Sequence, residues 1–201
     1  ERGITAPRGP APLRKTLNGI FAEPPADLSS RMLCLIGDLA LDWRTLDARV
    51  EAVSREIEML AENDEACQRL MTIPGIGVII SSAVVGAIGN GGAFKQGRDF
   101  AAWLGLAPKQ ASTGGKTKLG GLSKRGNKYL RTLFVQAAHI VLIRKPAAAQ
   151  RALWSWIERA SQRLPHRNLL AIALANKLAR IAWAVLARDH DYHPTVNTDA
   201  A

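Results

Sequence analysis

Cysteines and aromatic residues are scarce in this 201-residue sequence, and no long apolar run is uninterrupted. Its two cysteines, Cys34 and Cys67, are too far apart to form a metal-binding or redox motif. If one continuous helix carried both, they would be separated by roughly 50 Å and could not pair with each other. The longest apolar stretch, residues 169–186, contains three polar or charged residues and argues against a membrane span. No signal-peptide pattern is visible, and we expect reduced thiols in a cytoplasmic protein without a membrane partner.

Acidic residues are also in the minority, and the basic ones are unevenly distributed. The sequence has 27 Lys and Arg against 17 Asp and Glu, a formal net charge of +10. Residues 95–131 hold nine bases and one acid, and thus carry +8 of that charge. Such a concentration favours a polyanionic partner. Residues 38–65, with nine acids and three bases, should instead repel DNA.

A heptad pattern is the clearest structural signal. Residues 1–27 are rich in proline and read as a linker or extended arm, with a short helix around Leu13–Phe21. Residues 28–66 then place apolar side chains at alternating spacings of four and three, which is typical of a coiled coil. The partner is either a second copy of the chain or another part of the same chain. The seam consists of Met32, Ile36, Leu39, Trp43, Leu46, Val50, Val53, Ile57 and Leu60.

The remainder predicts a compact helical domain over residues 67–188 and a disordered tail over 189–201. Helices are expected on both sides of a Pro-Gly-x-Gly turn, at residues 99–106, and at Lys128–Ile143, Ala147–Leu164 and Asn168–Arg188. The predicted fold class is therefore all-α, with a long coiled-coil helix followed by this domain.

The turn Ile73–Gly77, followed by two serines and an alanine, matches the helix-hairpin-helix pattern of DNA-binding proteins. Gly75 and Gly77 permit positive φ and close backbone approach, which leaves N–H groups free at the start of the next helix. Such a helix end binds a phosphate without regard to base identity. The alternative is a turn that serves packing alone.

A basic, glycine-rich segment, residues 107–127, carries the hydroxyl groups of Ser112 and Thr113. Glycines beside hydroxyls would admit a phosphodiester, and cations would neutralise charge that develops during phosphoryl transfer. A serine nucleophile needs a base or a lowered pKa, and the nearest histidine in sequence is His139. The alternative is a phosphate-binding loop without chemistry. The candidate nucleic-acid contacts here are Thr113, Gly114, Gly115, Lys116, Lys118, Lys124, Arg125, Asn127 and Arg131.

Several side chains outside these motifs have both a functional and a structural interpretation. Trp154 and Trp156 either stack on bases or pack within the helices, and His139 is either a general base or an ordinary core or surface residue. A second set of bases either tracks phosphates or covers a solvated helix face. It comprises Arg159, Arg163, Arg167, Lys177, Arg180 and Arg188.

The ordered motifs of residues 73–77, 94–106, 108–116 and 119–131 resemble those of the insertion-sequence 110/1111 transposase family, which includes Piv-type DNA invertases. The resemblance implies a prokaryotic recombinase in which a coiled coil joins a RuvC-like domain to a C-terminal transposase domain. That domain supplies a catalytic serine, Ser112 by position, with Thr113 as the alternative. It also implies double-stranded DNA and a structured non-coding bridge RNA as partners, and a covalent phosphoserine intermediate.

The sequence departs from this pattern because it shows no RuvC-like domain. Four acidic residues of that domain bind Mg²⁺ in the family, so we expect no metal site and no cofactor in this chain. The chain is then a fragment of a longer enzyme or a truncated copy. Alone, it should bind nucleic acid without completing strand exchange. The rival hypothesis is a non-catalytic helix-hairpin-helix module, and the choice between dimer and tetramer stays open.

Overall fold

The computed structural model describes residues 4–113, 116–144, 151–164 and 166–193. The chain divides into two compact units, Glu1–Glu56 and Ile57–Ala201. Most of the described chain is helical, as the predicted all-α class required, and a single pair of short strands is its one departure among the described elements.

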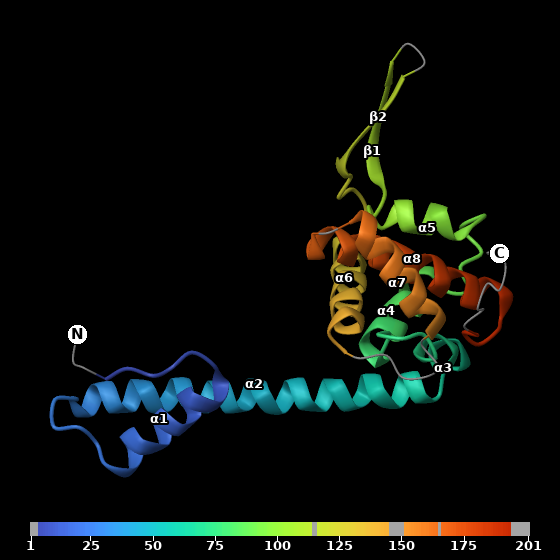
Figure 1. Ribbon diagram of the computed structural model, residues 1–201. Helices are drawn as coiled ribbons and strands as arrows, with labels where there is room; N and C mark the ends of the chain where they lie inside the picture. Colours follow the sequence, from blue (N-terminus) through green and yellow to red (C-terminus); the bar gives the residue numbers. More distant parts are fainter. Residues whose placement is uncertain (1–3, 114–115, 145–150, 165, 194–201) are drawn as a thin grey trace. The chain divides into compact units, whose positions relative to one another are not determined.

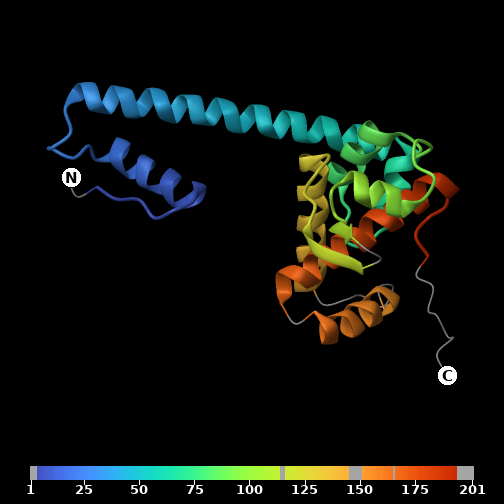
Figure 2. The same cartoon turned by 90° about the horizontal axis from the view of Figure 1, so that it is seen from above.

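The first unit pairs a short helix with the start of a long one. Helix α1 (Pro10–Ala22) begins with proline, whose fixed φ suits the first turn. It lies beside the first part of α2 (Ser30–Glu62) in both views (Figures 1 and 2). The Arg14 guanidinium donates to the Asp47 carboxylate at 2.8 Å and lies over the Trp43 ring, 5.2 Å from its centroid. The predicted short helix is confirmed, and this contact ties the proline-rich arm to α2.

Helix α2 is continuous for 33 residues and leaves most of its apolar seam uncovered. Six of the nine seam residues are 43–69% exposed, whereas Ile36, Ile57 and Trp43, which lies beneath Arg14, are partly buried. Most helical stability in proteins comes from packing of an apolar face rather than from propensity. The exposed seam residues are Met32, Leu39, Leu46, Val50, Val53 and Leu60.

The second unit is built around α8 (Arg167–Arg188), which packs against α3 (Glu65–Met71), α5 (Gly97–Trp103), α6 (Lys128–Ile143) and α7 (Arg151–Arg163). Helix α4 (Val78–Ile88) packs against α3 and α6. By length and composition α8 is the one described helix able to cross a membrane, but nine of its residues are buried in the core. Its apolar composition is therefore explained by its central position.

A two-stranded hairpin forms within the basic, glycine-rich segment, residues 107–127. Strand β1 (Pro108–Thr113) pairs antiparallel with β2 (Lys116–Leu122), and the hairpin projects from the helices (Figure 1). The register sets Thr113 opposite Lys116 and Ser112 opposite Thr117, with an irregularity between Pro108 and Gln110. Glycine disfavours a helix in this segment but still allows strand pairing, in which the backbone groups of the two strands bond to each other.

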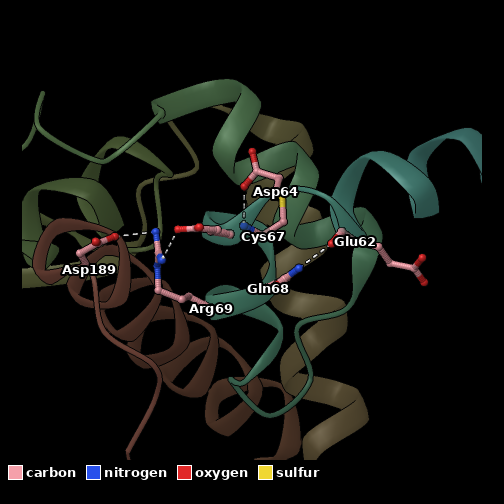
Figure 3. Close-up of polar contacts among 7 residues, drawn as sticks. Glu62, Asp64, Cys67, Gln68, Arg69 and Asp189 are labelled. Carbon is pink, nitrogen blue, oxygen red and sulfur yellow. Dashed lines mark hydrogen bonds and ion pairs between the residues drawn. The ribbon is translucent and has the colours of Figure 1, made fainter.

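An ion-pair cluster holds the end of α8 against α3 (Figure 3). Arg69 donates to Asp189 at 2.5 Å and to Glu65 at 3.4 Å, while its Nε is buried without a partner among the described residues. The backbone N–H of Tyr192 donates to Thr72 Oγ1 at 2.9 Å. Within the tail for which the sequence predicts disorder, Asp189 and Tyr192 thus contact the α3 region.

The two cysteines stand in different helices, so the distance estimate for one continuous helix does not apply. Cys34 is exposed on α2, Cys67 is buried on α3, and both are free. The α2 helix ends at Glu62, and Asp64 caps α3 by accepting from the Cys67 N–H at 2.8 Å (Figure 3). Burial raises the pKa of the Cys67 thiol, and the nearby Asp64 carboxylate adds to the effect.

Candidate nucleic-acid interface

The glycines of the α3–α4 turn have different roles. Gly75 has φ of +83°, and a Cβ there would lie 2.7 Å from Val141 Cγ2 and 2.9 Å from the carbonyl oxygen of Ala137. Glycine is therefore required because the turn packs directly on α6. The Ile76 N–H donates to the Ile73 carbonyl at 3.1 Å and closes the turn. Packing thus accounts for Gly75 independently of any ligand.

Gly77 occupies the exposed start of α4. It precedes the helix without a side-chain cap, and a Cβ added there would meet nothing within 4 Å. Its carbonyl accepts from the N–H groups of Ile80 and Ser81, at 3.0 and 2.9 Å, which leaves the first amides of α4 without intrahelical partners. An anion can approach those amides closely. The next two hydroxyls are occupied, since Ser81 and Ser82 both donate to the Val78 carbonyl.

The base of the hairpin is fixed by backbone hydrogen bonds between its two ends. The Ser123 N–H donates to the Ala107 carbonyl at 2.9 Å, and the Lys124 N–H donates to the Gly105 carbonyl at 3.2 Å. Lys124 itself has φ of +55°, an uncommon value for a residue with a side chain. These contacts position the strands without depending on the identity of residues near the tip.

Two side chains from other helices anchor the same base. Asn176 of α8 donates to the Leu106 carbonyl at 3.1 Å, and Arg131 of α6 donates to the Leu104 carbonyl at 3.0 Å. Buried backbone carbonyls near the start of the hairpin are thereby satisfied by side chains. The hairpin therefore projects from a base fastened to two core helices.

Two glycines that the sequence analysis did not single out complete this junction. Gly105 and Gly126 have φ of +73° and +94°. A Cβ on Gly126 would overlap the Trp103 carbonyl oxygen, and one on Gly105 would overlap the Arg125 carbonyl oxygen. The sequence shows only a glycine within each of two motifs, which does not reveal that Gly105 and Arg125 approach each other closely.

The structure places the predicted nucleic-acid residues in two groups. Ser112 and Thr113 stand at the end of β1, and Lys116 and Lys118 in β2, while Gly114 and Gly115 lie outside the described residues. Lys124 and Arg125 follow β2 and are exposed. The predicted nucleic-acid contacts between positions 112 and 118 thus lie on one hairpin.

Asn127 and Arg131 have structural partners instead. The Asn127 side chain caps α6 by accepting from the Leu130 N–H at 3.0 Å, and Arg131 holds the Leu104 carbonyl. Arg131 thus positions the hairpin base, whereas Asn127 stabilises the first turn of α6. Trp154 and Trp156 pack partly buried against the core, as the packing interpretation predicted, and His139 is half-buried on α6.

The charge of the site is strongly positive and comes from one stretch of sequence. Residues 95–131 supply +8 of the net +10, and they form α5, the hairpin and the start of α6. Across the described ranges, no group of three His, Cys, Asp or Glu side chains is placed to hold a metal ion. The concentration of basic side chains favours a polyanionic partner.

The sequence that forms this site matches a known protein family. Residues 67–155, which contain the turn, the hairpin and its anchoring helix α6, match the family described as Transposase IS116/IS110/IS902. A probable family 20 transposase of Pseudomonas aeruginosa is 43% identical over 191 residues, covering 95% of this chain and 56% of that protein. The chain belongs to the IS116/IS110/IS902 transposase family.

Two further relatives are a second transposase and a gene-inverting protein. The transposase for insertion sequence element IS1328 of Yersinia enterocolitica is 41% identical over 187 residues, 92% of this chain and 54% of that protein. A pilin gene-inverting protein of Moraxella bovis is 28% identical over 142 residues, 70% of this chain and 43% of that protein. The chain spans about half the length of the two transposases described above.

Proposed function

We propose that this chain is the nucleic-acid-handling, C-terminal part of a DNA transposase, in which the hairpin presents Ser112 as the nucleophile. The observation that carries the proposal is the hairpin itself. It gathers the hydroxyl and lysine residues of the most basic stretch on a projecting arm, and its base is fastened to α6 and α8. A preorganised cationic arm can meet a phosphodiester with little reorganisation.

The reaction on this hairpin is a transfer of the DNA phosphoryl group to serine. Ser112 Oγ attacks the phosphorus, a P–O ester bond to the DNA sugar breaks, and a phosphoserine ester forms. The serine proton leaves to a base, and the departing sugar oxygen takes up a proton. The cations Lys116, Lys118, Lys124 and Arg125 offset the negative charge that develops on the phosphoryl oxygens.

The helix-hairpin-helix assignment belongs to this proposal. The exposed start of α4 at Gly77 would bind one backbone phosphate, whereas Gly75 would hold the turn against α6. Such a contact fixes register on the duplex and reads no bases. A structured guide RNA is the second proposed partner. The Mg²⁺-binding RuvC-like domain lies in the remainder of the longer protein, and a cytoplasmic location stays a prediction.

Duplex binding should weaken steeply with salt. A protein that contacts 6–10 phosphates loses about 10³–10⁵ in affinity between roughly 50 and 200 mM salt. We expect the 201-residue chain to show a slope of this order with a 20-bp duplex, measured by fluorescence anisotropy. Replacing Lys124 and Arg125 by Gln should reduce the slope by about 2. The matched pair Arg8→Gln and Arg31→Gln in the first unit should leave it unchanged, and a flat wild-type response would contradict the proposal.

The exposed seam of α2 supports a homo-oligomer formed through a coiled coil. We expect the chain to sediment as a dimer or tetramer. Replacing Leu46 and Val53 by Glu should weaken self-association by about a hundredfold or more, because charges cannot be buried in an apolar seam. The matched changes Ala48→Glu and Ala52→Glu lie off the seam on the same helix and should have little effect. A monomeric wild type in analytical ultracentrifugation would refute the coiled coil.

A second candidate function is a non-catalytic helix-hairpin-helix module. The observation that favours it is the start of α4, which can bind a phosphate without any chemistry at the hairpin. The two candidates make the same binding prediction. They differ in what happens when Ser112 is replaced in the complete transposase, since only the enzyme loses a reaction.

A further inference from the structure

A basic pocket lies between α5 and α8, formed by residues other than those of the hairpin and the turn. It is a cavity of about 410 Å³. Its lining includes the cations Arg98, Lys177 and Arg180, together with Gln96 and Trp183, and none of its lining residues is acidic. Arg98 comes from α5, whereas Lys177 and Arg180 lie about one turn apart on α8.

The packing of α5 on α8 creates this pocket. A Cβ on Gly97 would lie 2.9 Å from the Arg180 carbonyl oxygen and 3.1 Å from the Arg180 Cα, so only glycine lets the two helices come this close. The loop before α5 is held as well, because Trp183 Nε1 donates to the Gly91 carbonyl at 3.1 Å. These contacts fix Arg98 beside the two cations of α8.

Within the part of the chain that the structure describes, no ion pair neutralises the positive charges of the pocket. The ion pairs found among the described residues involve Arg14, Arg55 and Arg69 and none of the three pocket cations. The nearest acid in sequence, Asp99, is outside the lining and accepts from Gln96 at 3.4 Å.

Among the pocket cations, Lys177 has a pKa that is lowered by its surroundings. Burial lowers the pKa of its ammonium group, and the charges of Arg180 and of Arg159 on α7 lower the pKa further. The ammonium also lies over the Trp156 ring, 5.1 Å from its centroid. Mutual repulsion among these cations is unfavourable in the free protein, so a bound anion would stabilise the arrangement.

We propose that this pocket binds a backbone phosphate of nucleic acid, as a contact separate from the hairpin. The inference rests on the proposed function for the nature of the ligand. Arg98 and Arg180 are exposed, so the site is open to a chain that passes across the surface rather than enclosing a small molecule. The lining offers cations and few groups that would read a base or a sugar, which fits a backbone contact.

Lysine acylation with mass-spectrometric readout tests the pocket directly on the 201-residue chain. We expect a saturating 20-bp DNA or RNA duplex to reduce acylation of Lys177 about tenfold. Lys15, exposed on α1, is the internal control and should change less than about twofold. Protection by one duplex type alone would assign the phosphate to that nucleic acid. Protection by inorganic phosphate at the same phosphate concentration, to the same extent, would overturn the nucleic-acid assignment.

Substitution of the exposed cations provides an independent readout. Arg98→Gln with Arg180→Gln should weaken duplex binding about tenfold at 100 mM salt and reduce the salt slope by about 2. Arg8→Gln with Arg31→Gln removes the same charge elsewhere and should not. A wild type that binds duplex while Lys177 stays fully reactive would overturn the pocket and leave the proposed function intact. No duplex binding at all would overturn the proposed function itself.

Discussion

Replacing Ser112 by Ala in the complete transposase should reduce DNA strand cleavage by about 10³-fold or more, since no other group would form the covalent bond. DNA affinity should change by less than about twofold, because a hydroxyl at the hairpin contributes little to backbone binding compared with the lysines. The measurement is single-turnover cleavage with Mg²⁺ and the matching guide RNA, alongside an anisotropy titration.

Two control variants make this result specific. Ser123→Ala removes a hydroxyl at the hairpin base and leaves intact the backbone N–H that bonds Ala107, so it should cleave at the wild-type rate. Thr113→Ala tests the neighbouring hydroxyl. Loss of cleavage in Thr113→Ala with retention in Ser112→Ala would move the nucleophile by one residue. Cleavage at the wild-type rate in both Ser112→Ala and Thr113→Ala would favour the non-catalytic binding module.

Replacing Gly126 by Ala should destabilise the second unit by about 3 kcal/mol or more. The new Cβ would overlap the Trp103 carbonyl oxygen, and φ of +94° is strained for any residue with a side chain. Because the overlap involves backbone on both sides, no side-chain rotation relieves it. Urea unfolding followed by circular dichroism measures the free energy of unfolding.

Gly121→Ala is the matched control for that substitution. Gly121 lies in β2, is exposed, and a Cβ there would meet nothing within 4 Å. Its free energy of unfolding should stay within about 1 kcal/mol of the wild type. If Gly126→Ala were equally mild, the close approach between residues 103 and 126 would be wrong.

The helices were largely predictable because their signals are local. The seam periodicity predicted α2, and the apolar stretches between Pro146, Pro165 and the C-terminal region predicted α7 and α8 closely. The strands of the hairpin were missed, although two arms separated by Gly114-Gly115 are a known hairpin signal. Glycine and lysine content disfavours a regular helix without indicating strands, and strands of six and seven residues show little periodicity.

The sequence predicted which residue types form the candidate site, but only in part how these residues are arranged in space. Basic residues in one stretch could be counted, but Arg131 and Asn127 have the same residue types whether they meet a phosphate or a backbone group. The anchor from Asn176 to Leu106 joins residues 70 positions apart, and the pocket joins Arg98 to Lys177 across a similar separation. Contacts of this kind depend on the packing of α8 against its neighbours, which no local pattern encodes.

Peptide mapping of the protein–DNA adduct tests the central claim most directly. The complete transposase, incubated with Mg²⁺, guide RNA and target DNA, would be denatured, digested and analysed by mass spectrometry. The account predicts a nucleotide esterified to Ser112 on the hairpin peptide, and its absence in Ser112→Ala. A cleaving enzyme whose adduct maps to a residue outside β1, or that forms no adduct at all, would contradict it.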